Sequence, residues 1–156
     1  MSLRSALGNP KRAAAVPIAA AASASATTTT SGCSVTPLTP VYAYTDYAGI
    51  KVLRYDIRVT CNGGRSAQIT QQTREEDTFS DDTIGTFSKS YHFTTYGTVT
   101  LSTYQRLPDT EWGDEEMYQR VSFRVVSDNG VASGYTSWEK SGVLSLIHIS
   151  EPTRPY

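Results

Sequence analysis

Residues 118–133, YQRVSFRVVSDNGVAS, constrain the fold more than any other stretch of the chain. The apolar residues of its first half are two positions apart: Val121, Phe123 and Val125. Polar residues stand between them, and this period of two is typical of a strand with one buried face and one face in water. A turn signal follows at Asn129-Gly130, because Asn and Gly tolerate the positive φ of a tight hairpin. The segment therefore predicts two adjacent antiparallel strands joined at that turn.

The same alternation recurs through the body of the chain. It is clearest over residues 50–61, where one face carries Leu53, Tyr55, Ile57, Val59 and Cys61. Further strands are predicted over residues 35–44, 67–74, 84–93 and 98–107. Pro37 and Pro40 mark the first of these as an edge strand, because proline donates no hydrogen bond to a neighbouring strand. The pattern predicts an all-β fold, a seven-stranded immunoglobulin-like antiparallel β-sandwich that follows a disordered N-terminal leader.

Two neighbouring motifs resemble a known family. Residues 107–111 read LPDTE, and residues 118–130 read YQRVSFRVVSDNG, with Ser133 beyond them. They resemble the E–F corner and the F–G hairpin of fibronectin type III domains, in which Leu-x-Pro-Gly-Thr leads into Tyr-x-Val-x-Val and an Asn-Gly turn. The resemblance implies the sandwich fold and no particular function. It gives Tyr118 two alternative roles, a corner tyrosine whose hydroxyl bonds back to the preceding loop, or a ring packed in the core.

The first 32 residues have a different composition. They contain no acidic residue, carry positive charge at Arg4, Lys11 and Arg12, and continue into an alanine-rich run that precedes TTTTSG. A positive start, an apolar middle and an Ala-Ser-Ala site predict a secretory signal peptide followed by a short linker. An organellar transit peptide or a disordered leader would have a similar composition.

Residues 144–154, LSLIHISEPTR, are similar to the translation of a sequencing adapter. We therefore expect residues 144–156 to be an artefact and place the sandwich domain at residues 33–143.

The chain has two cysteines, Cys33 and Cys61. In an exported domain, two cysteines predict a disulfide, because a metal site would need further ligands. The alternative is lipidation of Cys33, since Gly32 precedes it as in a lipobox. Thr30 stands where that motif requires an apolar residue, and lipidation would leave Cys61 unpaired.

Two predicted loops hold most of the acidic residues. If the strands alternate in direction, both loops leave the sandwich at the same end, together with a turn that contains Asp46. Carboxylates from several loops at one pole are suitable ligands for Ca²⁺. The candidate ligands are Asp77, Asp81, Asp82, Asp109, Glu111 and Asp114. Solvated loops that aid solubility are the alternative, because no loop has the spacing of an EF-hand.

Aromatic residues suggest a ligand surface, because rings with polar tips are common in sugar-binding and protein-binding sites. The candidate ligand-binding residues are Trp112, Tyr135 and Trp138. Packing in the core or between strands is the alternative for each ring.

Composition disfavours several functions. The formal net charge of -1 provides no basic field for nucleic acid, and no apolar run is long enough to span a bilayer. Outside the adapter-like tail His92 is the only histidine, and no catalytic motif is present, so we expect no enzyme.

The sequence therefore predicts a non-catalytic, secreted or cell-surface module that binds a protein or a glycan, or acts as a spacer, within a larger exported protein. A carbohydrate-binding module is the first alternative and a virion structural or decoration domain the second. No cofactor is expected apart from the possible Ca²⁺.

Overall fold

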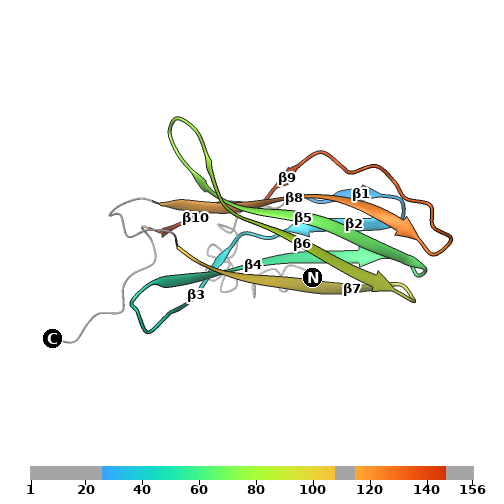
Figure 1. The fold of residues 1–156 in the computed structure, drawn as a ribbon, viewed down its shortest axis with the longest axis horizontal. Helices are drawn as coiled ribbons and strands as arrows, with labels where there is room; N and C mark the ends of the chain where they lie inside the picture. The colour runs from blue at the N-terminus through green and yellow to red at the C-terminus, as the bar shows by residue number, and fades with distance from the viewer. Residues whose placement is uncertain (1–25, 108–114, 147–156) are drawn as a thin grey trace, which may run out of the picture.

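The computed structural model describes residues 26–107 and 115–146, which form ten strands in two antiparallel sheets (Figure 1). The strands are β1 (Thr28–Thr30), β2 (Cys33–Pro37), β3 (Val41–Thr45), β4 (Lys51–Cys61), β5 (Arg65–Glu76), β6 (Asp82–Phe93), β7 (Gly97–Arg106), β8 (Glu116–Ser127), β9 (Glu139–Lys140) and β10 (Leu144–Ser145). The prediction of an all-β sandwich is confirmed, and the predicted number of seven strands is wrong. The described ranges contain no helix long and apolar enough to cross a membrane.

The first sheet, which we call sheet A, is built on β4. Strand β7 pairs with β4 along one edge from Val52 to Cys61. Strands β2 and β3 divide the other edge between them, and β1 pairs with β2. The predicted single strand over residues 35–44 is therefore two strands. Three residues, 38–40, stand opposite only two residues of β4, 55–56, so the ladder cannot continue without a break.

The second sheet, sheet B, places β5 between β6 and β8. The predicted turn after β8 is present: the amide of Gly130 donates to the Ser127 carbonyl oxygen at 2.8 Å. Gly130 alone takes the positive φ, 91°, whereas Asn129 does not. The single strand predicted from Val131 is wrong. Among the described residues after the turn, only a bridge at Ala132 and the short strands β9 and β10 pair with β8.

The segment after the turn nevertheless covers the outer edge of β8. Its amides donate to β8 carbonyl oxygens at intervals, as Ser133 to Val125 at 2.8 Å and Thr136 to Phe123 at 2.9 Å. These bonds satisfy the edge of β8 without the regular pairing of a strand.

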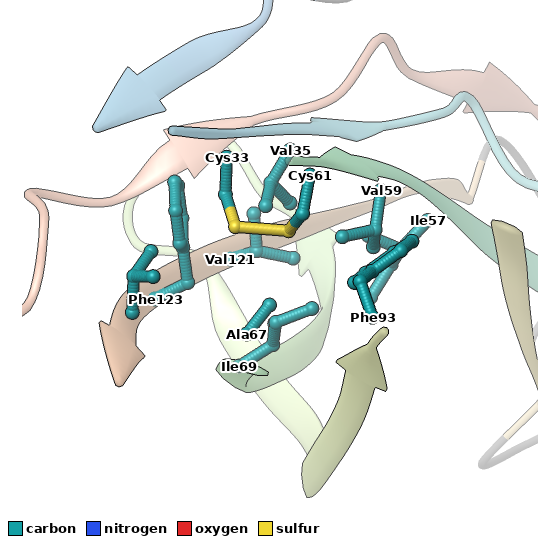
Figure 2. Packing of buried hydrophobic residues seen from close by; sticks show 11 residues of the cluster. Cys33, Val35, Ile57, Val59, Cys61, Ala67, Ile69, Phe93, Val121 and Phe123 are labelled. Atoms are coloured by element: carbon teal, nitrogen blue, oxygen red, sulfur yellow. A yellow bond between two sulfur atoms is a disulfide. The ribbon is translucent and has the colours of Figure 1, made fainter. Parts of the chain in front are cut away.

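The core lies between the two sheets and is formed by the inward positions that the alternation predicted (Figure 2). Its larger cluster consists of Cys33, Val35, Ile57, Val59, Cys61, Ala67, Ile69, Phe93, Val121, Phe123 and Val125. A smaller cluster is formed by Leu53, Tyr55 and Met117, with Leu144 and Leu146 packed against it.

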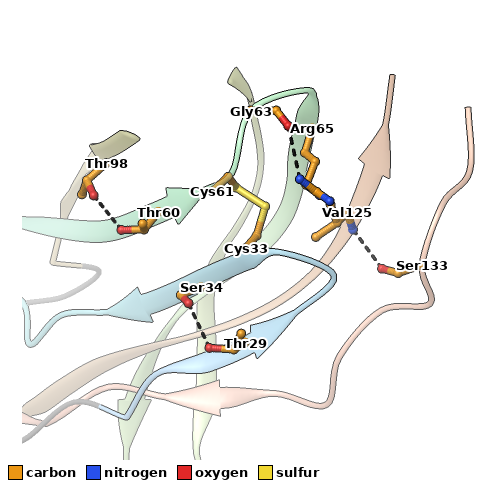
Figure 3. Close-up of a disulfide and its surroundings, with 10 residues drawn as sticks. All are labelled: Thr29, Cys33, Ser34, Thr60, Cys61, Gly63, Arg65, Thr98, Val125 and Ser133. Atoms are coloured by element: carbon orange, nitrogen blue, oxygen red, sulfur yellow. Dashed lines mark hydrogen bonds between the residues drawn. A yellow bond between two sulfur atoms is a disulfide. The ribbon is translucent and has the colours of Figure 1, made fainter. Parts of the chain in front are cut away.

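The predicted disulfide between Cys33 and Cys61 is confirmed (Figure 3). The two cysteines are directly opposite each other on β2 and β4, so the bond joins neighbouring strands of sheet A and does not link the two sheets. Hydrogen bonds on either side join the same strands to their outer neighbours: Thr29 to Ser34 at 2.9 Å, and Thr60 to Thr98 at 2.7 Å.

The two sheets are joined by a chain of buried polar side chains. Thr103 of β7 donates to Gln71 of β5 at 2.9 Å, and Gln71 donates to Gln119 of β8 at 2.7 Å. Gln119 then donates back to sheet A, to the carbonyl oxygens of Leu38 and Asp56 at 2.8 and 2.7 Å. Sheet A is thus hydrogen-bonded to sheet B at both ends of this series of side chains.

The sheets extend past both predicted domain boundaries. Strand β1 lies before residue 33, and its Thr28 hydroxyl bonds to Glu139. Strand β10 lies after residue 143 and pairs with β8 at Met117. Residues 1–25 and 147–156 lie outside the described part of the chain, so the signal peptide and the adapter-derived origin of the tail stay predictions.

Candidate functional site

Two of the three predicted ligand-binding residues come together on the outer face of sheet B. Tyr135 and Trp138 lie in the segment that follows the edge of β8, and the side chains of β8 that point outward support both rings. Trp112 lies outside the described residues. We call this surface the arginine–aromatic face, and its members are Gln68, Thr70, Gln72, Ser88, Ser90, Arg120, Arg124, Tyr135 and Trp138.

The alternation of β8 explains why two arginines lie on this face. Val121, Phe123 and Val125 point into the core, so Arg120 and Arg124 must point outward. Each is directly opposite a glutamine of β5 in the sheet register. The Nε atom of Arg120 donates to Gln72 Oε1 at 2.8 Å, and that of Arg124 donates to Gln68 Oε1 at 2.7 Å.

Each arginine also stacks on an aromatic ring. The Cζ atom of Arg120 is 4.4 Å from the ring centroid of Trp138, and that of Arg124 is 5.4 Å from the ring centroid of Tyr135. Such a contact contributes about 0.5–1 kcal/mol at an exposed site. The guanidinium group, fixed on one side by glutamine, therefore holds the ring in place on the other side.

Hydrogen bonds around Thr136 fix the backbone that carries the two rings. The amide of Phe123 donates to Thr136 Oγ1 at 3.1 Å, and Ser122 Oγ donates to the Thr136 carbonyl oxygen at 2.6 Å. Tyr135 and Trp138 lie on either side of this anchor and remain 53 and 41% exposed. The rings are therefore positioned and still accessible from solvent.

A shallow depression of about 280 Å³ lies beside Tyr135. Its lining combines apolar surface with the amide, hydroxyl and ammonium groups of polar residues: Gln68, Ile69, Thr70, Ser88, Lys89, Ser90 and Tyr135. The sheet register places Gln68 opposite both Ser90 and Arg124, so the depression continues the rows that carry the arginines. A site with one aromatic wall and a floor of amide and hydroxyl groups can bind a ligand rich in hydroxyl groups.

Arg120 and Arg124 take part in none of the ion pairs found among the described residues. Burial, together with the nearby positive charge of Arg74, lowers the pKa of Arg120. A guanidinium group remains charged at neutral pH in spite of such a shift. No carboxylate of the described chain forms an ion pair with either arginine, although the charge of Asp81 acts on Arg120 from a longer distance.

The acidic loops predicted to bind Ca²⁺ lie at one end of the sandwich, which we call the acidic pole. The register pairs Val52 with Arg106 and Glu76 with Glu116, so the β3–β4 turn, the β5–β6 loop and the start of β8 lie at the same end (Figure 1). The described residues contain no group of three His, Cys, Asp or Glu side chains that could hold a metal ion. Asp109, Glu111 and Asp114 lie outside the described residues.

Structural hydrogen bonds occupy two of the candidate carboxylates described at this pole, those of Asp77 and Asp81. Asp81 accepts from the Tyr118 hydroxyl at 2.5 Å and from the Asp77 amide at 3.1 Å, and these bonds lower the pKa of Asp81. Asp77 in turn accepts from the Thr78 amide at 2.6 Å, and Asp82 is exposed.

The Tyr118 hydroxyl also has a second partner besides Asp81. The hydroxyl donates to Asp81 and accepts from Arg74 Nε at 2.9 Å. Most of the loop before β8 lies outside the described residues, so the corner role implied by the resemblance stays a prediction. The ring is buried beside Lys140, whose Nζ atom is 4.3 Å from the ring centroid, and it belongs to neither core cluster.

No family model matches the chain. No curated protein matches it. Among solved structures, the chain is similar to a Bordetella pertussis protein named ApaA, with 18% identity over 74% of this chain and 92% of that one, and a TM-score of 0.40. It is also similar to a second structural genomics target, with 14% identity over 83% of this chain and 100% of that one, and a TM-score of 0.37. Neither is described as a fibronectin type III or immunoglobulin domain.

Proposed function

We propose that this chain is a non-catalytic β-sandwich module of an exported protein, and that it binds glycans through the arginine–aromatic face. The observation that carries the proposal is the fixed placement of Tyr135 beside a depression with amide and hydroxyl groups, and of Trp138 on the same face. Sugars present flat C–H faces that pack on aromatic rings and hydroxyl groups that bond to amides and hydroxyls. The face offers both kinds of partner within one rigid sheet.

Preorganisation supports binding at this face in preference to a loop. The rings are held by arginines that are themselves bonded to Gln68 and Gln72 on a neighbouring strand. A ligand that meets side chains already in position loses less conformational freedom on binding.

Titration with a panel of soluble polysaccharides tests this proposal. The chain has two tryptophans, Trp112 and Trp138, so a fluorescence change that Trp138→Ala removes is assigned to this face, and calorimetry gives the affinity. We expect Tyr135→Ala and Trp138→Ala each to weaken binding by about tenfold, which is the loss of one well-packed ring contact. Tyr47→Ala is the matched control, because Tyr47 is fully exposed in the turn between β3 and β4. Equal losses in all three variants, or no binding across the panel, would contradict the proposal.

A second candidate, a protein-binding or spacer module, is favoured by tyrosines on sheet A. The rings of Tyr44 and Tyr104 are 6.4 Å apart and tilted by 41°, and both are about half exposed. Exposed tyrosines are frequent at protein interfaces. Tyr44→Ser with Tyr104→Ser would weaken a protein complex and leave glycan binding at the opposite sheet unchanged.

We further propose that the sandwich is of the immunoglobulin or fibronectin type III kind. Its support is the division of the strands: β2, β4 and β7 lie in one sheet, while β5, β6 and β8 lie in the other. The chain crosses between sheets after β4, β6 and β7, as in a Greek-key sandwich. An experimental structure that superposes on neither fold would overturn this assignment.

Export is supported by the disulfide, because such bonds persist in oxidising compartments. N-terminal sequencing of the protein secreted from an expressing cell tests it. Cleavage after Ala24 or Ala26 is expected, and retention of an intact leader inside the cell would contradict export.

A further inference from the structure

We infer that the arginine–aromatic face selects an acidic polysaccharide, one whose sugars carry carboxylate groups, over a neutral one. This inference rests on the proposed glycan-binding function and adds the chemical class of the ligand. It is drawn from the hydrogen bonds and the charges around Arg120 and Arg124.

The two arginines have unused donors. Each uses its Nε atom to bond to a glutamine, and the described residues accept no hydrogen bond from their Nη atoms. A guanidinium group has five N–H donors in a planar fork that matches the two oxygens of a carboxylate. The stacked ring and the glutamine hold this fork in one orientation, so a ligand carboxylate would meet donors that are already positioned.

Three other cations of the described chain are paired with carboxylates. Arg54 bonds to Asp56 at 3.0 Å, Arg106 to Asp46 at 2.8 Å, and Lys140 to Glu76 at 3.5 Å. The arginines of the face differ from these cations, because their partners are neutral amides and rings. The positive charge of the face is thus available to a ligand.

The floor of the face carries no negative charge that would repel such a ligand. The outward positions of the three neighbouring strands in this region hold Ser66, Gln68, Thr70 and Gln72 of β5, Thr86, Ser88 and Ser90 of β6, and Ser122 of β8. All are neutral. A carboxylate placed here would interact with the two guanidinium groups. The charge of Asp81 also acts on Arg120, but the Asp81 carboxylate is bonded to Tyr118.

The spacing of the two arginines indicates that the ligand is a polymer of sugars. Arg120 and Arg124 are four residues apart on one strand, which corresponds to about 13 Å. A single sugar cannot contact both arginines, whereas a chain lying along β8 can. Nucleic acid also fits a row of cations, but the overall charge of -1 provides no wider basic field to bind it.

A pair of chemically matched probes tests the inference with the full chain. Polygalacturonate and its methyl ester have the same sugar backbone, and only the first carries free carboxylates. We expect calorimetry at physiological ionic strength to give an affinity for polygalacturonate about tenfold higher, as for one charge-assisted hydrogen-bonded contact. This comparison needs no variant, so it stands even if a substitution disturbs folding. Equal affinities for the two probes would overturn the inference.

Three single variants test which positive charges of the protein contribute to polygalacturonate binding. Arg120→Gln and Arg124→Gln should each weaken polygalacturonate binding by about tenfold and bring it close to that of the ester. Arg58→Gln removes the same charge from an exposed position on β4 of sheet A and should change binding by less than about twofold. Equal losses from Arg58→Gln would show a general charge effect and overturn the assignment to this face.

The outcomes separate this inference from the proposed function. If both probes bind equally and Tyr135→Ala abolishes binding, glycan binding stands and the preference for anions falls. If neither probe nor any neutral polysaccharide binds, both fall. If single-stranded DNA binds more tightly than polygalacturonate and depends on Arg120, the partner is a nucleic acid and the inference is wrong.

Discussion

Gln71 Nε2 donates a hydrogen bond to Gln119 Oε1 at 2.7 Å in the middle of the sandwich, where neither side chain is exposed to solvent. Each glutamine is further bonded to sheet A, Gln71 through Thr103 and Gln119 through the carbonyl oxygens of Leu38 and Asp56. Buried polar groups that are satisfied in this way fix the position of one sheet on the other. The disulfide cannot do so, since it joins two strands of the same sheet.

Replacing Gln119 with leucine should destabilise the fold strongly. The change removes two hydrogen bonds to sheet A and leaves Gln71 Nε2 without its acceptor, which should lower the free energy of unfolding by about 2–4 kcal/mol. Urea denaturation measures the loss. Gln72→Leu on the outer face is the control, with an expected change of about 0.5 kcal/mol. Similar losses of unfolding free energy in both variants would show that the buried hydrogen bonds of Gln119 contribute no more to stability than those of a surface glutamine.

Removal of the disulfide should lower stability without changing the fold. The bond closes a loop with a sequence separation of 28. On the chain-entropy estimate, Cys33→Ala with Cys61→Ala should cost about 3–4 kcal/mol. The midpoint of urea unfolding should fall, and a reducing agent should lower the wild-type midpoint to the same value while leaving the variant unchanged. A wild-type midpoint that resists complete reduction would contradict this account.

The bond between Tyr118 and Asp81 should make stability depend on pH. The hydrogen bond from Tyr118 lowers the pKa of the Asp81 carboxyl in the folded protein. The stabilisation is therefore present above the ordinary aspartate pKa of about 4 and is lost as the pH falls through the lowered value. Tyr118→Phe should be less stable than wild type at neutral pH, and the difference should shrink in acid. A difference in unfolding free energy that is the same at both pH values would exclude this origin.

Calcium should leave the melting temperature unchanged. At the acidic pole the Asp81 carboxylate already accepts hydrogen bonds from Tyr118 and Asp77, and Asp46 accepts from the amides of Ala48 and Ile50. A bound Ca²⁺ would have to share these oxygens with the hydrogen bonds that they already accept. Thermal unfolding with millimolar Ca²⁺, against Mg²⁺ as the control, measures the effect. A rise of several degrees with Ca²⁺ alone would show that the pole binds the ion.

The features that follow a local period could be predicted from the sequence. Inward residues recur at every second position of β4 and β8, which predicts that Tyr55, Cys61 and Phe123 lie in the core. The disulfide followed from the presence of only two cysteines. The location of the β3–β4 turn, the β5–β6 loop and the start of β8 at one end follows from the alternating directions of the strands.

Features that depend on the pairing of distant strands could not be predicted. Gln119 lies between the apolar residues Met117 and Val121, and no local signal gives it a partner 48 residues earlier in the chain. The stacking of Arg120 on Trp138 requires the path of the segment after β8, which is too irregular for a pattern search. The aromatic character of Tyr135 and Trp138 marks them as candidates, but no local pattern indicates that Arg120 and Arg124 support their rings.

The most direct test of a binding face on sheet B is a map of amide chemical shifts on addition of polygalacturonate. The largest changes are expected at residues 68–72, 120–124 and 135–138, which form one continuous surface. Smaller changes are expected at Tyr44 and Tyr104 on the opposite sheet. Changes centred on those tyrosines or on the β5–β6 loop would contradict the account, as would an unchanged spectrum at saturating polysaccharide.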